Sequence, residues 1–324
     1  MILQLKKSMN TGRNFPVCIL LVIIILIQSC KKEKTDSGYI DCTPIPPYTD
    51  VGFGYNYIID TVYYTCPDFN PNNPNEFVFI HKNYSTNSSK LYKYNIITNE
   101  KTLIYEGEIY FQPKWGINDW ILMNLPDANI WRIKSNGDSL TKLTENGGYY
   151  QPEWNENSDA ILFYDCCAPH NFFITDFYGN FIDTLPNNLP TSIKWINDSL
   201  IFYKYQFNIY CLNIFKNHID NIYSYMSNIS DPDGIVVTKQ LDLIFCKIDG
   251  IYSLKLYSNN ISLLKSTCNA KQYLFPTYSS FNDKIIWQRL DYTLIDKNNV
   301  FIKSRLVIMN SDGTNERLID IPNN

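Results

Sequence analysis

The sequence predicts an all-β protein, a six-bladed β-propeller with four antiparallel strands in each blade. The first observation is a repeat in which six aromatic or aliphatic anchor residues are each followed, six residues later, by a turn. The anchors are Tyr92, Trp131, Phe173, Tyr210, Tyr252 and Val307, and the turns lie at Thr98, Gly137, Gly179, Lys216, Ser258 and Gly313. A strand-containing unit that recurs about every 40 residues is typical of propellers.

The composition independently favours strands over helices. The 324 residues include 25 tyrosines and 18 phenylalanines but only four alanines, Ala128, Ala160, Ala168 and Ala270. Alanine is the best helix former, whereas aromatic and β-branched residues favour strands. The net charge of −4 and the lack of a dominant basic patch argue against a nucleic-acid partner.

A second motif precedes each anchor and marks the first strand of each blade. Its clearest forms are Pro113-Lys114-Trp115 and Pro152-Glu153-Trp154, and it is degenerate in blade five around Val237-Thr238. We expect the blade tryptophans Trp115, Trp154 and Trp195 to pack between blades. A strand is expected after each motif, at residues 77–80, 121–123, 161–164, 200–203, 243–245 and 285–287.

These two motifs together resemble the WD40-like repeats of TolB-type propellers. The resemblance covers residues 62–320, and it is strongest where Leu143-Thr144 follows Asn136-Gly137 and at Asp312-Gly313. It implies a six-bladed propeller that makes protein–protein contacts in the bacterial cell envelope without catalysing a reaction. Because one fold serves many functions, the resemblance specifies the fold better than the activity.

The motifs divide the chain into three parts: residues 1–29 as a signal peptide, 30–54 as a flexible tether and N-terminal arm, and 55–324 as the propeller. The expected blades span residues 66–106, 110–145, 149–186, 190–226, 233–267 and 273–321. The strand-like stretch 55–65 has two interpretations. It either completes blade six as an outer strand or belongs only to the entry into blade one.

The N-terminus resembles a bacterial lipoprotein signal. Lys6, Lys7 and Arg13 precede an apolar run over residues 16–27, which is too short for a membrane-spanning helix of roughly 20 residues. The run ends at Ser29-Cys30, which implies cleavage before Cys30 and lipid attachment to it. Loss of the three basic residues with the leader would take the net charge from −4 to −7. The alternative is an ordinary signal peptide with an incidental cysteine.

The other cysteines suggest covalent links suited to an exported protein. Cys42 and Cys66 form a plausible disulfide that would hold the N-terminal arm against blade one. The adjacent Cys166 and Cys167 could bridge each other or reach another loop. No metal or other cofactor is expected, because the three histidines His81, His170 and His218 are scattered and a metal site needs three or four converging ligands.

Candidate binding residues lie in the loops between blades and between second and third strands, which propeller connectivity places on one face. The candidates are Tyr110, Gln112, Tyr149, Tyr150, Gln151, Asp165, His170 and Tyr273. Residues 289–304 are expected to form a long loop on the same face. Aromatic and amide groups around a channel mouth suit a peptide or a glycan. The alternative is that the aromatic residues only cap the blade ends.

Three functions are compatible with these features. The first is a lipid-anchored, monomeric platform that binds an envelope protein or peptide. The second is a surface lipoprotein that binds glycans, and the third is a propeller-type polysaccharide lyase or hydrolase. The chain contains no G-x-S-x-G, H-E-x-x-H or phosphate-binding glycine motif. The last expected strand lies at Leu318-Ile319, so we expect no additional hydrolase domain.

Overall fold

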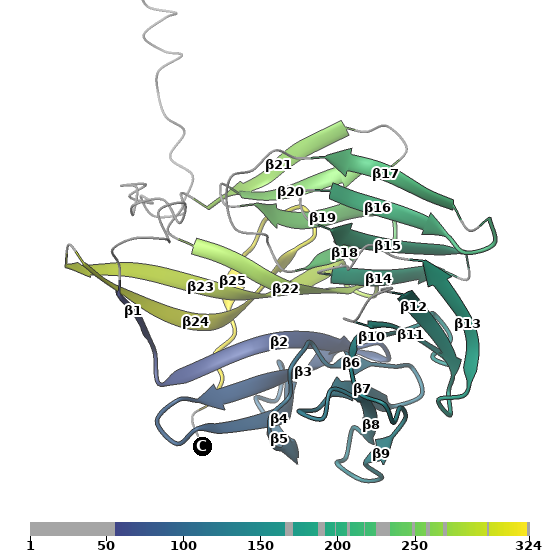
Figure 1. Ribbon diagram of the computed structural model, residues 1–324. Coiled ribbons are helices and arrows are strands. Elements are labelled where there is room, and N and C mark those ends of the chain that lie inside the picture. The colour runs from purple at the N-terminus through teal and green to yellow at the C-terminus, as the bar shows by residue number, and fades with distance from the viewer. Residues whose placement is uncertain are drawn as a thin grey trace, which may run out of the picture. The chain divides into compact units, whose positions relative to one another are not determined.

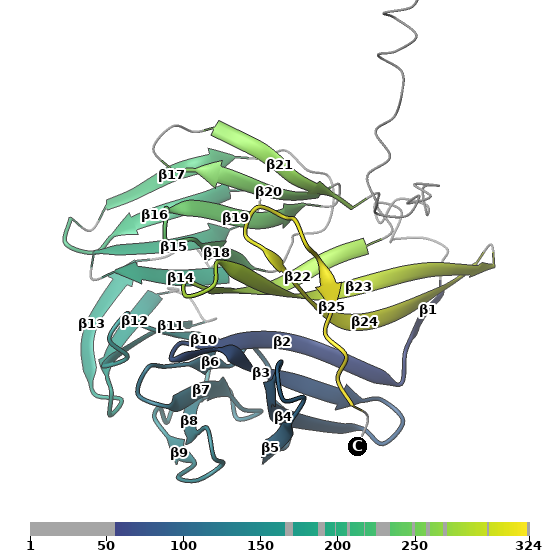
Figure 2. The same cartoon turned by 180° about the vertical axis from the view of Figure 1, so that it is seen from behind.

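The computed structural model confirms the all-β propeller (Figures 1 and 2). It describes residues 56–322 except 166–170, 187–191, 198, 206–207, 217, 225–233, 248–249, 257–259, 268–270 and 297. Within these residues no helix occurs, and so none is long and apolar enough to cross a membrane. Cys42–Asn324 form one compact unit, which contains the whole propeller.

The first strands of the six blades surround the central channel. They are β2 (Val62–Asn70), β6 (Lys114–Trp115), β10 (Tyr149–Trp154), β14 (Ser192–Asn197), β18 (Ile235–Val237) and β22 (Lys271–Ser279). Each of these strands contacts the first strand of the next blade, and β22 contacts β2, so the ring is closed. Radial repetition of small blades leaves only short sheet edges, in place of the long edges of one open sheet.

Each blade continues outward as an antiparallel meander. The second strands are β3 (Asn73–Asn83), β7 (Trp120–Asn124), β11 (Ala160–Asp165), β15 (Leu200–Tyr205), β19 (Asp242–Lys247) and β23 (Lys284–Asp296). The third strands are β4 (Ser88–Asn95), β8 (Ile130–Lys134), β12 (Asn171–Asp176), β16 (Asn208–Asn213), β20 (Gly250–Lys255) and β24 (Asn299–Asn310). The fourth strands of blades one to five are β5 (Lys101–Glu106), β9 (Thr141–Lys142), β13 (Phe181–Pro186), β17 (His218–Ser224) and β21 (Asn260–Ser266). Every expected second strand lies inside an observed one, and every anchor lies on a third strand.

Blade six is built differently, because two strands share its outer position. β1 (Asn56–Ile59) pairs in parallel with one end of β24, and β25 (Arg317–Leu318) pairs antiparallel with the other. Residues 56–59 therefore join blade six as an outer strand, and β2 of blade one begins at Val62, so the stretch 55–65 does not belong only to the entry into blade one. The ring is thus closed by segments from both ends of the propeller sequence.

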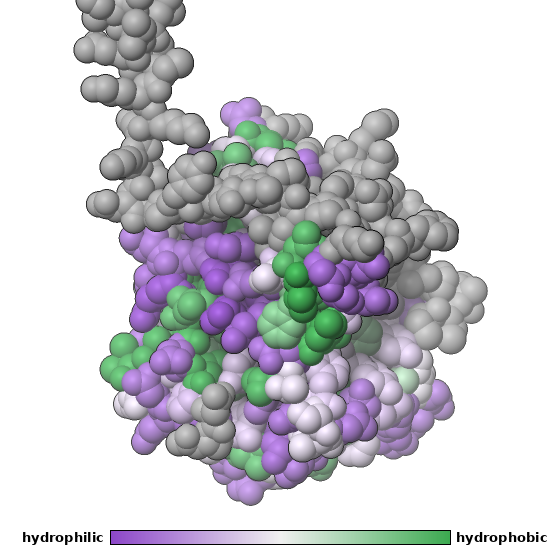
Figure 3. Space-filling view, turned by 90° about the vertical axis from the view of Figure 1, so that its left-hand side faces the viewer, coloured by the Kyte–Doolittle hydropathy of each residue, from purple (hydrophilic) through white to green (hydrophobic). Residues whose placement is uncertain are grey.

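The long loop expected at residues 289–304 is instead a two-stranded ribbon, so that expectation was wrong. β23 and β24 stay paired from Arg289↔Arg305 to Asp296↔Asn299. Apolar and β-branched residues dominate both strands there, which favours pairing over an irregular loop. The ribbon and β1 expose Ile58, Leu294 and Ile295. Figure 3 views the side of the molecule where the ribbon lies and shows apolar side chains gathered among polar ones.

The core is divided among the spaces between blades. Separate apolar clusters fill the spaces between blades one and two, two and three, three and four, four and five, five and six, and six and one. Trp115 and Trp154 are 5% and 7% exposed in two of these clusters, and Trp195 packs against a third. This confirms the expected packing role of the blade tryptophans. The Trp154 indole also donates a 3.1 Å hydrogen bond from Nε1 to the Lys114 carbonyl of the preceding blade.

The repeated turn six residues after each anchor has a steric cause. Gly137, Gly179 and Gly313 have φ of 90°, 90° and 83°, a region that glycine adopts without strain. A Cβ at each would lie 3.0, 2.5 and 3.0 Å from a carbonyl oxygen on the outer part of the preceding blade. Blade one uses Asn99 at φ 60°, which asparagine tolerates. The turn between third and fourth strands therefore packs directly on the neighbouring backbone.

Candidate binding site in the central channel

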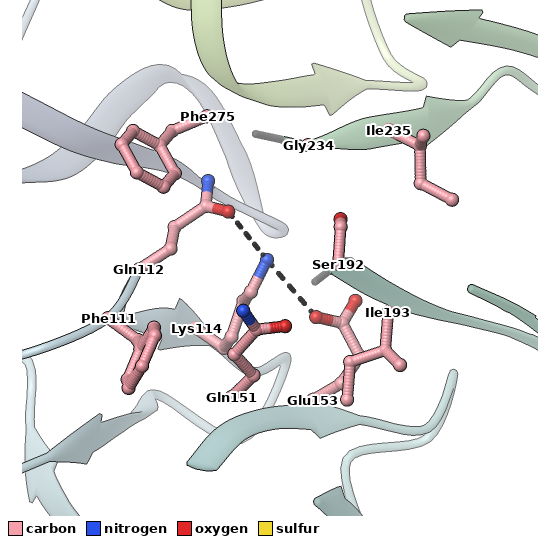
Figure 4. A pocket seen from close by; sticks show the side chains of 10 residues that line it. All are labelled: Phe111, Gln112, Lys114, Gln151, Glu153, Ser192, Ile193, Gly234, Ile235 and Phe275. Atoms are coloured by element: carbon pink, nitrogen blue, oxygen red, sulfur yellow. Dashed lines mark hydrogen bonds and ion pairs between the residues drawn. The ribbon is translucent and has the colours of Figure 1, made fainter. Parts of the chain in front are cut away.

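The mouth of the channel, on the side of the loops between blades, holds a pocket of about 440 Å³ (Figure 4). We call it the mouth pocket. It is lined by Phe111, Gln112, Lys114, Gln151, Glu153, Ser192, Ile193, Gly234, Ile235 and Phe275. Five blades contribute to this lining, mostly from the first strand or the residues just before it. The pocket therefore depends on the closed ring rather than on any single blade.

Bulges in the first strands form part of this lining. Gln151 and Phe275, each directly before the motif proline, have φ of 49° and 46°, and Cys66 has φ 53° at the matching place in blade one. The pairing of β10 with β11, of β22 with β23 and of β2 with β3 shifts register at these points. A bulge redirects a side chain, and left-handed non-glycine residues concentrate at functional sites. Gln151 and Phe275 both line the mouth pocket as a result.

Four charged side chains cross the channel below the mouth pocket: Asp68, Lys114, Glu153 and Lys194. We call them the charged belt. The Lys114 ammonium lies 3.1 Å from Glu153 Oε2, and Lys194 Nζ contacts Glu153 Oε1. Lys114 Nζ also donates to Gln112 Oε1 at 3.0 Å, which links the belt to the pocket wall (Figure 4). Because Glu153 is 3% exposed, this is a buried chain of charges that joins blades two, three and four.

Asp68 extends the belt to blades one and six. Its Oδ2 accepts a 2.7 Å hydrogen bond from the Trp115 N–H of blade two, and its Oδ1 accepts one of 3.0 Å from the Thr277 hydroxyl of blade six. Thr277 Oγ1 in turn accepts a 3.1 Å bond from the Phe69 N–H. The belt thus connects every blade except the fifth, where Val236 occupies the corresponding position opposite Ile244.

The pKa values of Asp68, Glu153 and Lys194 are shifted in different directions. Burial raises the pKa of Asp68 above its ordinary value, although Lys114 and Lys194 oppose this. Burial also opposes ionisation of Glu153, but the same two lysines outweigh it and hold the pKa of Glu153 below its ordinary value. For Lys194, burial is outweighed by Glu153 and Asp68, and its pKa is raised. Glu153 is therefore the charge on which the two lysines depend.

Acid should remove the contribution of Glu153 to stability. Because its folded-state pKa is lowered, that contribution is complete above the ordinary glutamate pKa of about 4.3 and is lost as the pH falls through the folded-state value. Asp68 has the opposite sign, because its raised pKa makes protonation on acidification favourable. We expect urea unfolding at pH 7 to 3 to show a smaller acid-side loss of stability in Glu153→Gln than in the wild type. Parallel curves for the two proteins would contradict this.

The structure brings together only some of the residues predicted from the sequence. Gln112 and Gln151 line the mouth pocket. Tyr110 is 44% exposed beside it, and Tyr150 packs edge-on against Phe111 with ring centroids 5.3 Å apart. Tyr149 packs against two phenylalanines of blade three, which is the alternative role considered for the aromatic residues.

The other predicted site residues lie away from the pocket lining. Asp165 accepts a 3.0 Å hydrogen bond from the Asn171 N–H, which closes the base of its own loop. Tyr273 is 0% exposed, and its hydroxyl donates a 2.9 Å hydrogen bond to Glu316. It is therefore part of the protein interior and not of the binding face. His170 lies outside the described residues.

Lys114, Glu153, Ser192 and Phe275 are pocket residues that the loop-based prediction missed. A signal for two of them was present in the repeat itself. In each motif one residue lies between the proline and the next aromatic residue. This residue is Asp68 in blade one, Lys114 in blade two and Glu153 in blade three, so the charge alternates at one structural position. Opposite charges at equivalent places of neighbouring blades predict an ion-paired ring around the channel.

The remaining sequence predictions concern cysteines and metals. Cys66 is buried at the bulge in β2, whereas Cys42, its predicted disulfide partner, lies outside the described residues, as do Cys30, Cys166 and Cys167. The pairing stays a prediction. In the part of the chain that the structure describes, no group of three or more His, Cys, Asp or Glu side chains is arranged to hold a metal ion.

Comparisons with known proteins agree on the fold. No protein-family model matches the chain, and no curated protein sequence matches it. A solved structure described as TolB from Agrobacterium tumefaciens is similar, with a TM-score of 0.58 and 17% identity over 72% of this chain and 88% of that one. The propeller domain of the trilobed protease from Pyrococcus furiosus has a TM-score of 0.53 and 11% identity over 82% of this chain and 100% of that one.

A peptidase shares the same architecture in part. The acylaminoacyl peptidase of Pyrococcus horikoshii has a TM-score of 0.54 and 11% identity, and the match covers 80% of this chain but 52% of that one. At such low identities, these likenesses show a shared fold. The protein is a six-bladed β-propeller with TolB-like structural neighbours, built around a channel that carries a polar mouth pocket and a charged belt.

Proposed function

We propose that this protein is a lipid-anchored propeller of the bacterial cell envelope that binds an extended segment of a partner protein in its mouth pocket. The observation that carries the proposal is the lining of that pocket. Gln112, Gln151 and Ser192 supply amide and hydroxyl groups, while Phe111 and Phe275 supply apolar surface. The resemblance of the repeats to TolB-type propellers supports a protein as the partner.

The chemistry of the pocket favours a peptide over an ion. Lys114 and Glu153, the charged groups of its lining, are paired with each other, so their charges are compensated. Amide and hydroxyl groups match the donors and acceptors of a peptide backbone, and aromatic walls accept an apolar side chain. The pocket lies at the channel mouth among the first strands of five blades, so a short segment would reach its lining more readily than a folded surface would.

Lipid on Cys30 would hold the propeller at a membrane. The proposed tether, residues 30 to 54, would join this lipid to β1. We expect Cys30→Ala to move the protein from the membrane fraction to the soluble fraction of lysed cells. Retention of this variant in the membrane fraction would contradict the proposed anchor.

Blocking the mouth pocket should abolish peptide binding. Peptides would be selected from a random library against the purified protein, and their affinities measured by titration calorimetry. Ser192→Arg places a long side chain in the pocket, and we expect affinity to fall at least tenfold, about 1.4 kcal/mol.

Ser280→Arg is the matched control, because exposed Ser280 lies at the other end of the channel. Affinity should be unchanged in this variant. Selected peptides that bind Ser192→Arg as tightly as the wild type would show that the mouth pocket is not their site.

A further inference from the structure

The opposite end of the channel contains a second cavity, which we call the lower chamber. It consists of two adjoining lobes of about 470 and 610 Å³ that share Asp68, Pro71, Trp115 and Lys194 in their linings. The lobes lie at the turns between first and second strands, beyond the charged belt from the mouth pocket.

The belt makes the inner wall of the lower chamber electrically neutral overall. Lys194 is paired with Glu153, and both carboxylate oxygens of Asp68 accept hydrogen bonds, from Trp115 and Thr277. Two acidic and two basic side chains therefore compensate each other. An ionic ligand would find no uncompensated opposite charge on this wall, and the exposed carboxylate of Glu156, which also lines one lobe, disfavours an anion.

Two polar atoms of the chamber lining have no partner within the protein. Ser279 is 4% exposed and lines one lobe, and its hydroxyl makes no hydrogen bond. Trp195 lines the other lobe, and its Nε1–H makes none either. Such unsatisfied buried groups are rare in folded proteins and call for an explanation. Both atoms are enclosed, so contact with a ligand in the chamber requires each side chain to turn towards it.

The rest of the lining is aromatic and polar. Trp115, Trp195 and Tyr278 contribute rings, and Phe281, at the rim, is 65% exposed. Asn155 and Glu156 add polar groups to one lobe. Flat apolar rings next to hydrogen-bonding groups fit a ligand with apolar faces and hydroxylated edges.

We propose that the lower chamber binds a neutral sugar unit of a glycan, with Ser279 and Trp195 hydrogen-bonded to its oxygens. A pyranose ring combines C–H faces for the aromatic rings with hydroxyl groups at its edge, and it carries no charge. This site is separate from the mouth pocket and does not depend on the proposed peptide binding or on the lipid anchor.

Titration of the purified protein with maltotriose, cellotriose and chitotriose tests the proposal, with calorimetry and tryptophan fluorescence as readouts. We expect at least one trisaccharide to bind and to change the fluorescence. Trp195→Phe keeps a ring but removes the N–H, and Ser279→Ala removes the hydroxyl. Each should weaken binding by about fivefold to tenfold, the effect of one hydrogen bond, while melting temperatures stay close to that of the wild type.

Two blocking variants provide the controls. Ser280→Arg should abolish sugar binding, whereas Ser192→Arg, in the mouth pocket, should leave it unchanged. The proposal is overturned if none of the three trisaccharides binds at concentrations up to about 10 mM, an affinity of about −3 kcal/mol. It is also overturned if Ser192→Arg weakens binding as much as Trp195→Phe and Ser279→Ala do.

Discussion

Replacing Glu153 by alanine is expected to lower the free energy of unfolding by about 3–5 kcal/mol, the range for removing one partner of a buried ion pair. Glu153 is 3% exposed and is the carboxylate that both Lys114 and Lys194 contact. Its removal leaves two largely buried ammonium groups without their partner. Urea unfolding at pH 7, followed by tryptophan fluorescence, measures the effect.

Two comparisons make this prediction specific to the belt. His218 Nε2 lies 3.0 Å from Asp220 Oδ1, with both side chains more than 60% exposed, so Asp220→Ala should change stability by no more than about 0.5 kcal/mol. Replacement of the whole belt, with methionine at Lys114 and Lys194, leucine at Glu153 and asparagine at Asp68, should recover most of the loss, because no charge of the belt is then left unpaired. Equal small effects of Glu153→Ala and Asp220→Ala would contradict a buried, interdependent belt.

The second large effect is expected at the turn of blade three. Gly179→Ala should lower the free energy of unfolding by about 2 kcal/mol or more, because the left-handed conformation alone costs an alanine about 1–2 kcal/mol. The new Cβ would also lie 2.5 Å from the Leu143 carbonyl oxygen of blade two, and backbone cannot easily move away. Chemical unfolding of the variant and the wild type measures the difference.

Equivalent positions in the turns of other blades provide comparisons for this effect. Lys216 is the corresponding residue of blade four and is exposed, so Lys216→Ala should change stability by no more than about 0.5 kcal/mol. Gly137→Ala should fall between the two, since its Cβ would lie 3.0 Å from the Ile104 oxygen. If all three variants were equally stable, the steric explanation of the repeated turn would be wrong.

The repeat made most of the fold predictable. Each blade must pack its third-to-fourth-strand turn and its apolar strand faces against a neighbour, so the same residue types recur at the same places. Gly137, Gly179 and Gly313 are examples, since sterics restrict their positions. The ribbon at residues 289–304 has no counterpart in the other blades. Its pairing with β1, more than 200 residues earlier in the chain, could not be inferred from a local pattern.

The binding site was harder to predict, because the prediction used the composition of the loops. The pocket is lined mostly by residues of the first strands or by residues just before them. Gln112 and Gln151 were found because the sequence placed them in the loops between blades. Tyr273 has a similar sequence context but turns into the space between blades five and six, where it packs against Trp287. Phe275 reaches the pocket only because its backbone is left-handed. A bulge of this kind changes which side chain faces the channel.

The most direct test of the account is site-specific photocrosslinking in intact cells. A photoreactive amino acid replaces Gln151 in the mouth pocket or, as the control, Phe215, which is 76% exposed outside the described pockets. Crosslinked material is purified through a C-terminal tag, and mass spectrometry maps the attached residues. The account predicts that Gln151 captures one reproducible short segment of an envelope protein, that Phe215 does not, and that Ser192→Arg abolishes the capture. The same products from both positions, or none from Gln151, would contradict it.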